Sequence, residues 1–347
     1  MNTREFVAEW HPQWGVLLAW PHPDTDWADN LEAAETCYTQ IVSAISQREN
    51  VLLLCHDAGH QMHIEQVLSQ SASWKAKNVH FMRIPYNDTW ARDFGFITVM
   101  QDGRPLLLDF TFNAWGGKFA ANLDNAINAQ LAALPLLAGN MLETHPLVME
   151  GGSLETDGQG TLLTTEICLL NPNRNPSLDK SAIETRLRTA LGVERVLWLA
   201  NGHLEGDDTD AHIDTLARFA DPQTVVYMSC ADPADAHYLP LQAMEAELRA
   251  LRQANGAPYQ LLPIPLPAAI YDGDRRLPAS YVNFLIINGA VLLPVYADET
   301  ADAIAIAQMQ AAFPRHEIVP IDCRALIAQN GSLHCITMQI PQEAVSA

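Results

Sequence analysis

The chain has 347 residues, and hydrophobic residues make up 48% of it, so it is long enough to bury a large core. Asp and Glu number 41 against 20 Lys and Arg, which gives a formal net charge of -21. An acidic surface repels nucleic acids and anionic membranes, because both bind cationic surfaces, whereas it is compatible with a small cationic substrate.

The cysteines predict a protein with reduced thiols. The six form no CxxC pair and show no regular spacing, so a disulfide framework is not expected and the cytoplasm is the expected location. Residues 1–12 contain no apolar segment of a signal peptide. The longest apolar runs, such as 284–287 and 291–295, are far shorter than the roughly 20 residues that cross a bilayer.

Short apolar runs predict strands along the whole chain. In chain order they are 15–20, 51–55, 95–100, 105–110, 161–165, 195–200, 224–229, 281–287, 290–295 and 317–321. Segments with apolar residues at i, i+3 and i+4 predict helices at 31–47, 122–134, 179–191, 241–253 and 300–313. Asp298 or Thr300 is expected to cap the last helix, and Pro314 is expected to end it.

This alternation of strands and helices predicts an α/β or mixed α+β fold. No linker rich in Pro, Gly or Ser and no long run of charge divides the chain, so residues 1–347 are expected to form a single domain. Periodicity alone does not distinguish a doubly wound sheet from another arrangement of the same elements.

Four polar segments lie between apolar, strand-like flanks. They are NDTWARDFG (87–95), EGGSLETDGQGTLLTTE (150–166), GDDTDAHIDTLARF (206–219) and NGSLHCITMQIP (330–341). Reactive side chains concentrate in loops that a rigid scaffold holds, so these segments are the expected sources of a functional site.

The residue types in these segments are those of a nucleophilic active site. A thiolate nucleophile needs a partner for proton transfer, and carboxylates can orient that partner. The candidates are the thiol of Cys335, the imidazole of His212, and the carboxylates of Asp88, Asp93, Glu150 and Asp214. Structural alternatives stay open for each residue taken singly, since a cysteine before a strand is often a small buried hydrophobe and an aspartate often caps a turn.

Two other kinds of site are less favoured. The run 207–210, beside His212 and Asp214, could hold a metal ion, but it lacks the glycine and the distal glutamate of an EF-hand. The chain contains no HExxH or CxxC metal motif. A papain-like protease would carry a C-G-[SA]-C-[WY] signature near its N-terminus, and this signature is absent.

Together the four segments resemble those of agmatine deiminases and bacterial-type peptidylarginine deiminases, within the guanidine-modifying superfamily. The resemblance extends from WHP (10–12) to the C-terminal HCIT (334–337). Further matching stretches are TFNAWGG (111–117), CLLNPNRNP (168–176), VLWLANG (196–202) and YVNFLIINGAVLLPVY (281–296). The fold that this resemblance implies is a five-bladed, pseudo-symmetric α/β propeller of ββαβ-type units around a central site.

Carried over by motif, the resemblance implies five catalytic residues: Asp93, Glu150, His212, Asp214 and Cys335. A guanidinium is planar, always charged and donates in a fork, so carboxylates can hold it over a thiolate. In the implied reaction Cys335 attacks the guanidinium carbon, His212 protonates the departing ammonia, and water releases a ureido product from an amidino-thioether. These steps need no cofactor and no metal.

Agmatine is the favoured substrate. Enzymes that deiminate arginine or peptidyl-arginine bind a carboxylate or a peptide backbone, which generally calls for an arginine. TFNAWGG and its neighbours carry no Arg, and the nearest cation is Lys118. The ammonium of agmatine prefers acidic and aromatic neighbours, so Asp88, Trp90 and Trp115 are expected to bind substrate. The alternatives are deimination of arginine or peptidyl-arginine, and a catalytically silent guanidine-binding protein.

Two segments depart from the family pattern, and both are expected at the mouth of the pocket. WPHPDTDW (20–27) stands where the agmatine enzymes read WPERPDNW, and AQNGS (328–332) replaces a glycine-rich run. Neither a nucleic acid nor a membrane is expected as a partner, and a homo-oligomer stays open. A place in polyamine synthesis, toward putrescine, follows from the resemblance alone.

Overall fold

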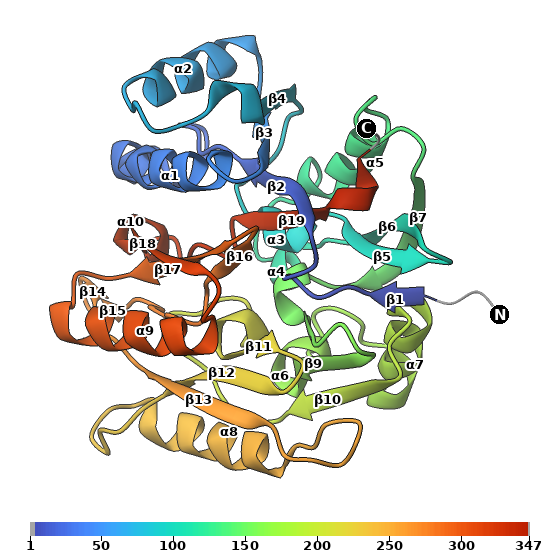
Figure 1. Ribbon diagram of the computed structural model, residues 1–347, viewed down its shortest axis with the longest axis vertical. Coiled ribbons are helices and arrows are strands. Elements are labelled where there is room, and N and C mark those ends of the chain that lie inside the picture. Colours follow the sequence, from blue (N-terminus) through green and yellow to red (C-terminus); the bar gives the residue numbers. More distant parts are fainter. Residues whose placement is uncertain (1–3, 346–347) are drawn as a thin grey trace.

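The strands form several small sheets rather than one large sheet (Figure 1). The computed structural model describes residues 4–345. Within these residues, five sheets contain three or four strands each, and a sixth is a short hairpin of β14 (Tyr271–Asp272) and β15 (Arg275–Arg276). No sheet of the described chain closes on itself. The mixed α/β class that the sequence predicts is confirmed.

The five larger sheets share one strand order. Each contains an antiparallel pair, and the second strand of that pair is followed by a parallel neighbour. Parallel neighbours cannot be joined by a tight turn, so each unit needs a crossover connection, and helices supply it. In Figure 1 the sheets surround the middle of the molecule, and the longer helices lie toward the outside.

The strand bounds follow the apolar runs of the sequence. In the order of the sheets they are β19 (Thr337–Pro341), β2 (Gln13–Ala19), β3 (Asn50–Cys55) and β4 (Val79–Arg83); β1 (Arg4–Phe6), β5 (Ile97–Gln101), β6 (Arg104–Thr111) and β7 (Met141–Val148); β10 (Arg195–Leu199), β9 (Thr161–Thr165) and β8 (Glu155–Thr156); β11 (Ala217–Asp221), β12 (Thr224–Ser229) and β13 (Gln260–Pro265); β16 (Leu285–Ile287), β17 (Ala290–Val295) and β18 (Glu317–Asp322).

The helices predicted at 31–47, 179–191, 241–253 and 300–313 are confirmed, with shifts at their ends. The α-helices are α1 (Leu31–Ser46), α2 (Ala58–Ser69), α3 (Ala91–Phe94), α4 (Ala114–Gly117), α5 (Ile127–Ala132), α6 (Glu166–Leu169), α7 (Lys180–Leu191), α8 (Tyr238–Ala250), α9 (Glu299–Ala312) and α10 (Arg324–Ile327). The 3-10 helices are η1 (Ala28–Asn30), η2 (Ala76–Asn78), η3 (Asp124–Ala126), η4 (Gly151–Ser153), η5 (Ile213–Thr215) and η6 (Gln342–Ala344). The Asp298 carboxylate caps α9 by accepting from the N–H of Ala301 at 3.0 Å.

Two predicted elements need correction. The helix expected at 122–134 is divided into η3 and α5. The strand expected at 281–287 begins only at Leu285, because the residues before it form a turn in which the N–H of Asn283 donates to Ser280 O at 3.3 Å. This turn directs a polar side chain inward from a segment that reads as a strand.

The two ends of the described chain are tied into the sheets. β19 pairs with β2, from Thr337 opposite Leu18 to Pro341 opposite Gln13, and β1 pairs with β5. One cluster of buried apolar side chains extends from Phe6 to Ala344. The segment that carries Cys335 therefore leads directly into β19, and this strand is paired with β2 from the N-terminal part of the chain.

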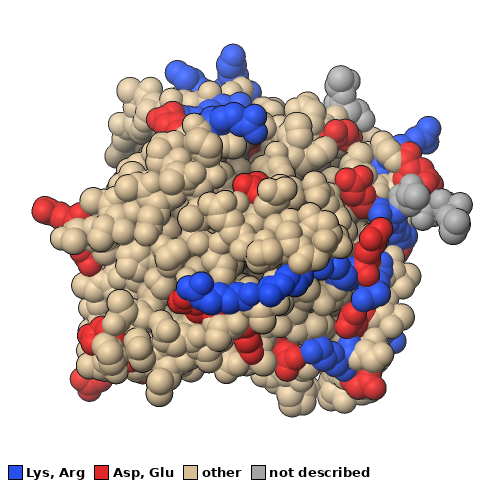
Figure 2. Space-filling model, turned by 60° about the horizontal axis from the view of Figure 1, so that its bottom comes forward, with Lys and Arg blue, Asp and Glu red and all other residues tan. Residues whose placement is uncertain are grey.

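Charge on the face in Figure 2 is mixed, with basic side chains lying among acidic ones and uncharged surface between them. Within residues 4–345, no helix is both long enough and apolar enough to span a membrane.

Candidate active site

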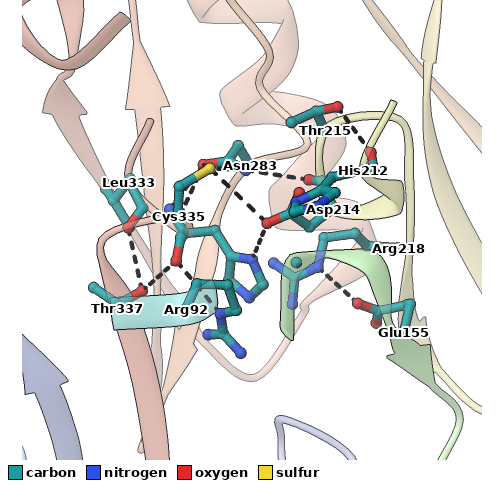
Figure 3. Close-up of polar contacts among 12 residues, drawn as sticks. Arg92, Glu155, His212, Asp214, Thr215, Arg218, Asn283, Leu333, Cys335 and Thr337 are labelled. Carbon is teal, nitrogen blue, oxygen red and sulfur yellow. Dashed lines mark hydrogen bonds and ion pairs between the residues drawn. The ribbon is translucent and has the colours of Figure 1, made fainter. Parts of the chain in front are cut away.

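The connections between successive sheets converge on one buried site. Asp93 lies in α3, between β4 and β5, and Glu150 lies between β7 and β8. His212 and Asp214 lie between β10 and β11, and Cys335 lies between β18 and β19. Each of these side chains is at most 5% exposed. The structure therefore brings together all five residues predicted as catalytic, and Figure 3 shows three of them side by side.

The Cys335 sulfur faces Asp214 and Asn283 (Figure 3). Sγ lies 4.0 Å from Asp214 Oδ2 and 3.3 Å from Asn283 Nδ2. The carbonyl of Cys335 accepts from the N–H of Arg92 at 3.1 Å, which fixes the loop before β19 against α3. Burial and the charges of Asp214 and Asp93 raise the pKa of the Cys335 thiol well above its usual range.

The His212 ring lies between two carboxylates. Nδ1 is 3.7 Å from Asp93 Oδ1, and Nε2 is 3.7 Å from Glu150 Oε2. Burial acts to lower the pKa of His212, but Asp93, Cys168 and Glu150 together raise it well above its usual range. His212 is thus set up as a proton donor at neutral pH, because its charged form is the favoured one.

Asp93 is held by two donors. The indole Nε1 of Trp115 donates to Oδ2 and the N–H of Gly152 donates to Oδ1, each at 2.9 Å. Trp115 adopts a φ of 53°, a strained conformation for a side chain of this size, and this turn carries its indole to Asp93. Burial raises the pKa of Asp93 to about 6, although the nearby His212 acts to lower it.

Asp214 has one bound oxygen and one free oxygen. Its Oδ2 accepts from His334 Nδ1 at 2.8 Å, whereas its buried Oδ1 has no hydrogen-bond partner. Burial acts to raise the pKa of Asp214, but the contact with His334 outweighs it and the pKa is lowered. An ionised, buried carboxylate with a free oxygen can accept an N–H from a bound cation.

Glu150 is fixed by Arg174. The Nε of Arg174 lies 3.0 Å and 2.9 Å from the two Glu150 oxygens, and its Nη1 lies 2.6 Å from Asp210 Oδ2. Burial acts to raise the pKa of Glu150, but the nearby His212 and the charge of Arg174 lower it. Glu150 therefore presents a negative charge to His212.

A cavity of about 100 Å³ leads to Cys335. Its lining consists of four aspartates, three aromatic residues and a few polar or small residues: Asp26, Asp88, Asp93, Asp208, Trp90, Trp115, Phe119, Thr209, Gln329, Asn330, Gly331 and Cys335. The three residues predicted to bind substrate, Asp88, Trp90 and Trp115, all lie in this lining. Trp27 Nε1 donates to Asp88 Oδ1 at 2.9 Å, which orients that carboxylate.

Both segments that depart from the family pattern reach this cavity, as expected. Asp26 comes from the first segment, and Asn330 and Gly331 come from the second. Asn330 Nδ2 donates to Asp208 Oδ2 at 3.1 Å, so the second segment is linked to the loop before His212. Gly331 lies so close to Trp90 that a Cβ atom there would be 2.1 Å from the indole ring.

One set of side chains has the composition of a metal site. Glu150, Cys168 and His212 place an oxygen, a sulfur and a nitrogen within 4.8 Å of one another. The Arg174 cation already bonds to both Glu150 oxygens, so a second cation there would be repelled, and the geometry favours an ion pair. Within residues 4–345 the run Asp207–Asp210 forms no such set, since Asp207 accepts from Thr209 and Ala211 and shapes a turn.

Several site residues were not assigned a role from sequence. Asn283 lies in YVNFLIING, where a polar residue between apolar neighbours was the available signal. His334 immediately precedes Cys335, and Arg174 lies in CLLNPNRNP. Glu9 accepts from His334 Nε2 at 2.7 Å, and nothing in the sequence near Glu9 indicates that contact.

Comparison with known proteins agrees with this geometry. Residues 5–341 match the profile of the Porphyromonas-type peptidyl-arginine deiminases. The chain belongs to this family. A Vibrio parahaemolyticus protein provisionally named as an agmatine deiminase is 36% identical, over 97% of this chain and 96% of its own length.

Solved structures of family relatives superpose closely. A Porphyromonas gingivalis protein provisionally named as an arginine deiminase has a TM-score of 0.92 at 50% identity, covering 99% of this chain and 100% of that one. A C. jejuni agmatine deiminase solved with substrate bound has a TM-score of 0.91 at 39% identity, covering 98% and 97%. The family and these relatives are all named as deiminases.

Proposed function

We propose that this chain is an agmatine deiminase, which hydrolyses agmatine to N-carbamoylputrescine and ammonia. The observation that carries the proposal is the lining of the Cys335 cavity, where four aspartates and three aromatic side chains occur without a described Lys or Arg. Agmatine is cationic at both ends, and cations prefer carboxylates and aromatic faces. Named agmatine deiminases among the relatives support this choice.

The two ends of agmatine would meet different aspartates. Asp214 Oδ2 lies 4.0 Å from the Cys335 sulfur and its Oδ1 is free to accept an N–H from the guanidinium, while Asp93 lines the cavity together with Cys335. Asp26 and Asp208 also line the Cys335 cavity and are more exposed than the catalytic carboxylates, so the ammonium would lie beside them. Trp90 and Trp115 would enclose the aliphatic chain between the two charges.

The bound cation would also ionise the nucleophile. Burial and two carboxylates raise the pKa of the Cys335 thiol, so the free protein favours the protonated thiol. A guanidinium held between Asp93 and Asp214 would place a positive charge beside Sγ and lower that pKa. The thiolate would then form mainly when the substrate is present.

The reaction would proceed in two halves. The Cys335 thiolate attacks the guanidinium carbon, and His212 transfers its proton to one amino group, which leaves as ammonia. The covalent amidino-thioether that remains is attacked by water as His212 takes a water proton. Collapse breaks the C–S bond, regenerates the thiolate and frees the ureido product, and the remaining proton passes to solvent, where ammonia takes it up.

Deimination of arginine or peptidyl-arginine is the second candidate. A relative with 50% identity is provisionally named as an arginine deiminase, and the family name refers to peptidyl-arginine. Two cations near the mouth could meet a carboxylate, namely Lys118 and Arg275. Lys118 donates to Asp208 O and Asp210 Oδ1. Arg275 donates to Asn330, Ala328 O and Asp272. Because both cations already have partners, neither favours this candidate over agmatine.

Direct assay decides between these candidates. Purified protein is incubated separately with agmatine, arginine and a peptide that contains arginine, and ureido product and ammonia are measured. We expect turnover of agmatine far above the other two, and loss of about 10³-fold or more in Cys335→Ser. Agmatine binding without ammonia release would identify a silent binding protein, and silence with all three would refute the deiminase assignment.

We also infer that the five sheets are the blades of a pseudo-symmetric propeller within one catalytic domain. The common strand order and the convergence of inter-sheet connections on Cys335 support this inference. A single cooperative unfolding transition is expected.

We further assign the protein to the cytoplasm, because the described cysteines are all free: Cys37, Cys55, Cys168, Cys230, Cys323 and Cys335. Native protein, once denatured, should therefore contain six titratable thiols.

A further inference from the structure

A second cysteine, Cys168, lies beside the imidazole of His212. The sulfur of Cys168, an oxygen of Glu150 and a ring nitrogen of His212 lie within 4.8 Å of one another, and all three side chains are buried. Cys168 does not belong to the lining of the cavity that leads to Cys335. The thiol therefore neighbours the proton donor of the proposed reaction without lining the space for the substrate.

Thr165 ties the backbone of Cys168 to the segment that carries His212. The helix α6 directly follows β9, and Thr165 is its N-cap (Figure 1). Thr165 Oγ1 accepts from the N–H of Cys168 at 3.4 Å and donates to the carbonyl of Ala211 at 2.8 Å. Ala211 immediately precedes His212, so one hydroxyl fixes the position of the thiol relative to the imidazole.

The two carboxylates beside His212 favour only one of its protonation states. Nε2 is buried without a hydrogen-bond partner and lies 3.7 Å from Glu150 Oε2, and Nδ1 lies 3.7 Å from Asp93 Oδ1. Ionised carboxylates only accept, so they stabilise a charged ring but repel the bare nitrogen of a neutral ring. In the proposed reaction the ring passes through both states, because it gives a proton to the departing ammonia and later takes one from water.

A neutral thiol can serve both states of the ring. Burial raises the pKa of the Cys168 thiol, although the nearby His212 acts to lower it, so the thiol keeps its proton at neutral pH. Its sulfur can accept an N–H from the charged ring, and its S–H can donate to the bare nitrogen of the neutral ring.

We propose that Cys168 is a positioning residue whose thiol hydrogen-bonds to His212 and holds the ring in place as it loses and regains its proton. This inference rests on the proposed function, in which His212 carries the proton. Cys168 acts through His212, so its loss should slow the reaction without weakening the binding of substrate.

Cys168→Ser and Cys168→Ala separate this role from simple packing. The two variants have nearly the same size, but only Ser keeps a group that donates and accepts. A cysteine that only fills space would tolerate Ala better than Ser, because a buried hydroxyl without a partner is destabilising. A hydrogen-bonding cysteine reverses this order. We expect Cys168→Ala to lower kcat for agmatine about tenfold or more, with KM changed by less than about twofold, and Cys168→Ser to retain most of kcat.

A second readout needs no substrate. Histidine rings are labelled with ¹⁵N, and the His212 signals in the NMR spectrum are assigned by their loss in His212→Gln. At neutral pH one His212 ring signal should move in Cys168→Ala and return toward its original position in Cys168→Ser. Should Cys168→Ala fail to fold, Cys168→Val and Cys168→Thr provide a second pair that differs only in the hydroxyl.

Cys55 provides the matched control. It is also fully buried, and its Sγ donates to Met82 O at 3.5 Å on β3, away from His212. Cys55→Ser and Cys55→Ala should both leave kcat and the His212 signals unchanged.

A kcat of Cys168→Ala equal to or above that of Cys168→Ser would overturn the proposal and leave Cys168 as a packed residue. A moved His212 signal in a protein that turns over none of agmatine, arginine or peptide would support the contact between Cys168 and His212 and refute the deiminase. Turnover of agmatine with the same kcat in every Cys168 variant would refute the role of Cys168 alone.

Discussion

The Cys335 sulfur lies 4.0 Å from Asp214, a carboxylate that would bind the substrate cation yet disfavours ionisation of the thiol. Without substrate the two negative charges would repel each other, and this repulsion contributes to the raised pKa of Cys335. With a guanidinium between them, both anions face a cation. Binding of the substrate and activation of the nucleophile are thus coupled through Coulomb interactions among a few side chains.

Asp214→Asn should increase the reactivity of the thiol while it weakens substrate binding. The Asn oxygen can still accept from His334, but the negative charge beside Sγ is lost. We expect alkylation of Cys335 to be about tenfold faster at fixed pH, since one pKa unit corresponds to tenfold, and the KM for agmatine to rise at least tenfold. Asp208→Asn, which lies in the lining of the Cys335 cavity but not in contact with Sγ, should raise KM and leave alkylation unchanged. Slower alkylation of Asp214→Asn would contradict this account.

His334 joins two carboxylates through its two ring nitrogens. Nδ1 contacts Asp214 Oδ2 at 2.8 Å and Nε2 contacts Glu9 Oε2 at 2.7 Å. Each ring nitrogen thus contacts a different buried carboxylate. We therefore infer that His334 orients Asp214 as a positioning residue, since His334 does not belong to the lining of the Cys335 cavity.

Two substitutions of His334 separate its two contacts. Asn places an amide nitrogen near the position of Nδ1, whereas Gln places one near the position of Nε2. We expect His334→Asn to retain at least tenfold more kcat/KM for agmatine than His334→Gln, because the contact with Asp214 is the one that orients the substrate. Circular dichroism checks that both variants fold. Equal losses in the two variants would indicate that His334 has a structural role only.

At the scale of elements, the segment that carries Asp88, Trp90 and Asp93 is held by a reciprocal pair of side chains. Asp124 Oδ1 accepts from the N–H groups of Asn87 and Asp88 at 2.6 Å and 3.3 Å. Asn87 Oδ1 accepts in return from the N–H groups of residues 123 and 124 at 2.7 Å and 3.3 Å. The chain before α3 and the chain at η3 thus fix each other, which positions one wall of the cavity.

Asp124 should make stability depend on pH. Burial raises its pKa to about 7, so the folded protein holds a proton that the unfolded chain releases at lower pH. The stability that this carboxyl contributes is therefore complete at acid pH and is lost as the pH rises toward about 7. Asp124→Asn keeps the accepting oxygen and does not titrate, so its stability relative to the unmodified chain should increase between pH 5 and pH 8, on the order of 1–3 kcal/mol. Urea unfolding at both pH values measures this, and a constant difference would contradict it.

Element prediction succeeded where the signal was local. Buried strands such as β9 and β17 read as apolar runs, and α7 and α9 begin at aspartates whose carboxylates accept from the helix N-terminus. The turn before β16 was missed because its residues are apolar enough to read as a strand. The helix α2 was missed because it buries little beyond Ile64 and Leu68, so its apolar periodicity is weak.

At the scale of the whole molecule, the Glu9 carboxylate joins distant parts of the chain. Its Oε2 lies 2.8 Å from Arg218 Nη2 and 2.7 Å from His334 Nε2, and its Oε1 accepts from the N–H of Ile286 at 2.7 Å. These partners come from the fourth sheet, the Cys335 loop and the fifth sheet. Glu9 thereby fixes the N-terminal segment against the Cys335 loop and the fifth sheet. Arg218 compensates the negative charge of the Glu9 carboxylate.

Glu9→Gln should strongly destabilise the fold, because Arg218 and His334 would each lose one buried carboxylate partner, and only Glu155 and Asp214 respectively would remain. We expect a loss of about 3–5 kcal/mol in the free energy of unfolding at pH 7, measured with urea. Glu343→Gln breaks the exposed pair with His11 and should cost less than about 1 kcal/mol.

Acid titration provides the second readout for Glu9. Burial acts to raise the pKa of Glu9, but Arg218 and His334 outweigh it and the pKa is lowered. Its contribution is therefore present above the pKa of the unfolded chain and is lost as the pH falls below it. Glu9→Gln should lack this part of the acid destabilisation. Equal effects of the Glu9 and Glu343 substitutions would refute the role of the Glu9 network.

The sequence by itself determined the properties that depend on composition and on neighbours along the chain. These are the mixed α/β class, most of the strands and longer helices, and the loops that carry Cys335, His212 and the carboxylates. Family motifs added the set of five candidate catalytic residues, because a motif preserves side chains that must act together even when they lie far apart in sequence.

Only the tertiary structure decided which partners surround those residues. The contacts of Glu9 with His334, of Trp115 with Asp93 and of Asn283 with Cys335 join residues separated by 325, 22 and 52 positions. No local pattern encodes such a contact, because it arises where several inter-sheet connections meet. The protonation states follow from the same packing, since burial and nearby charge set them, and both depend on the folded chain.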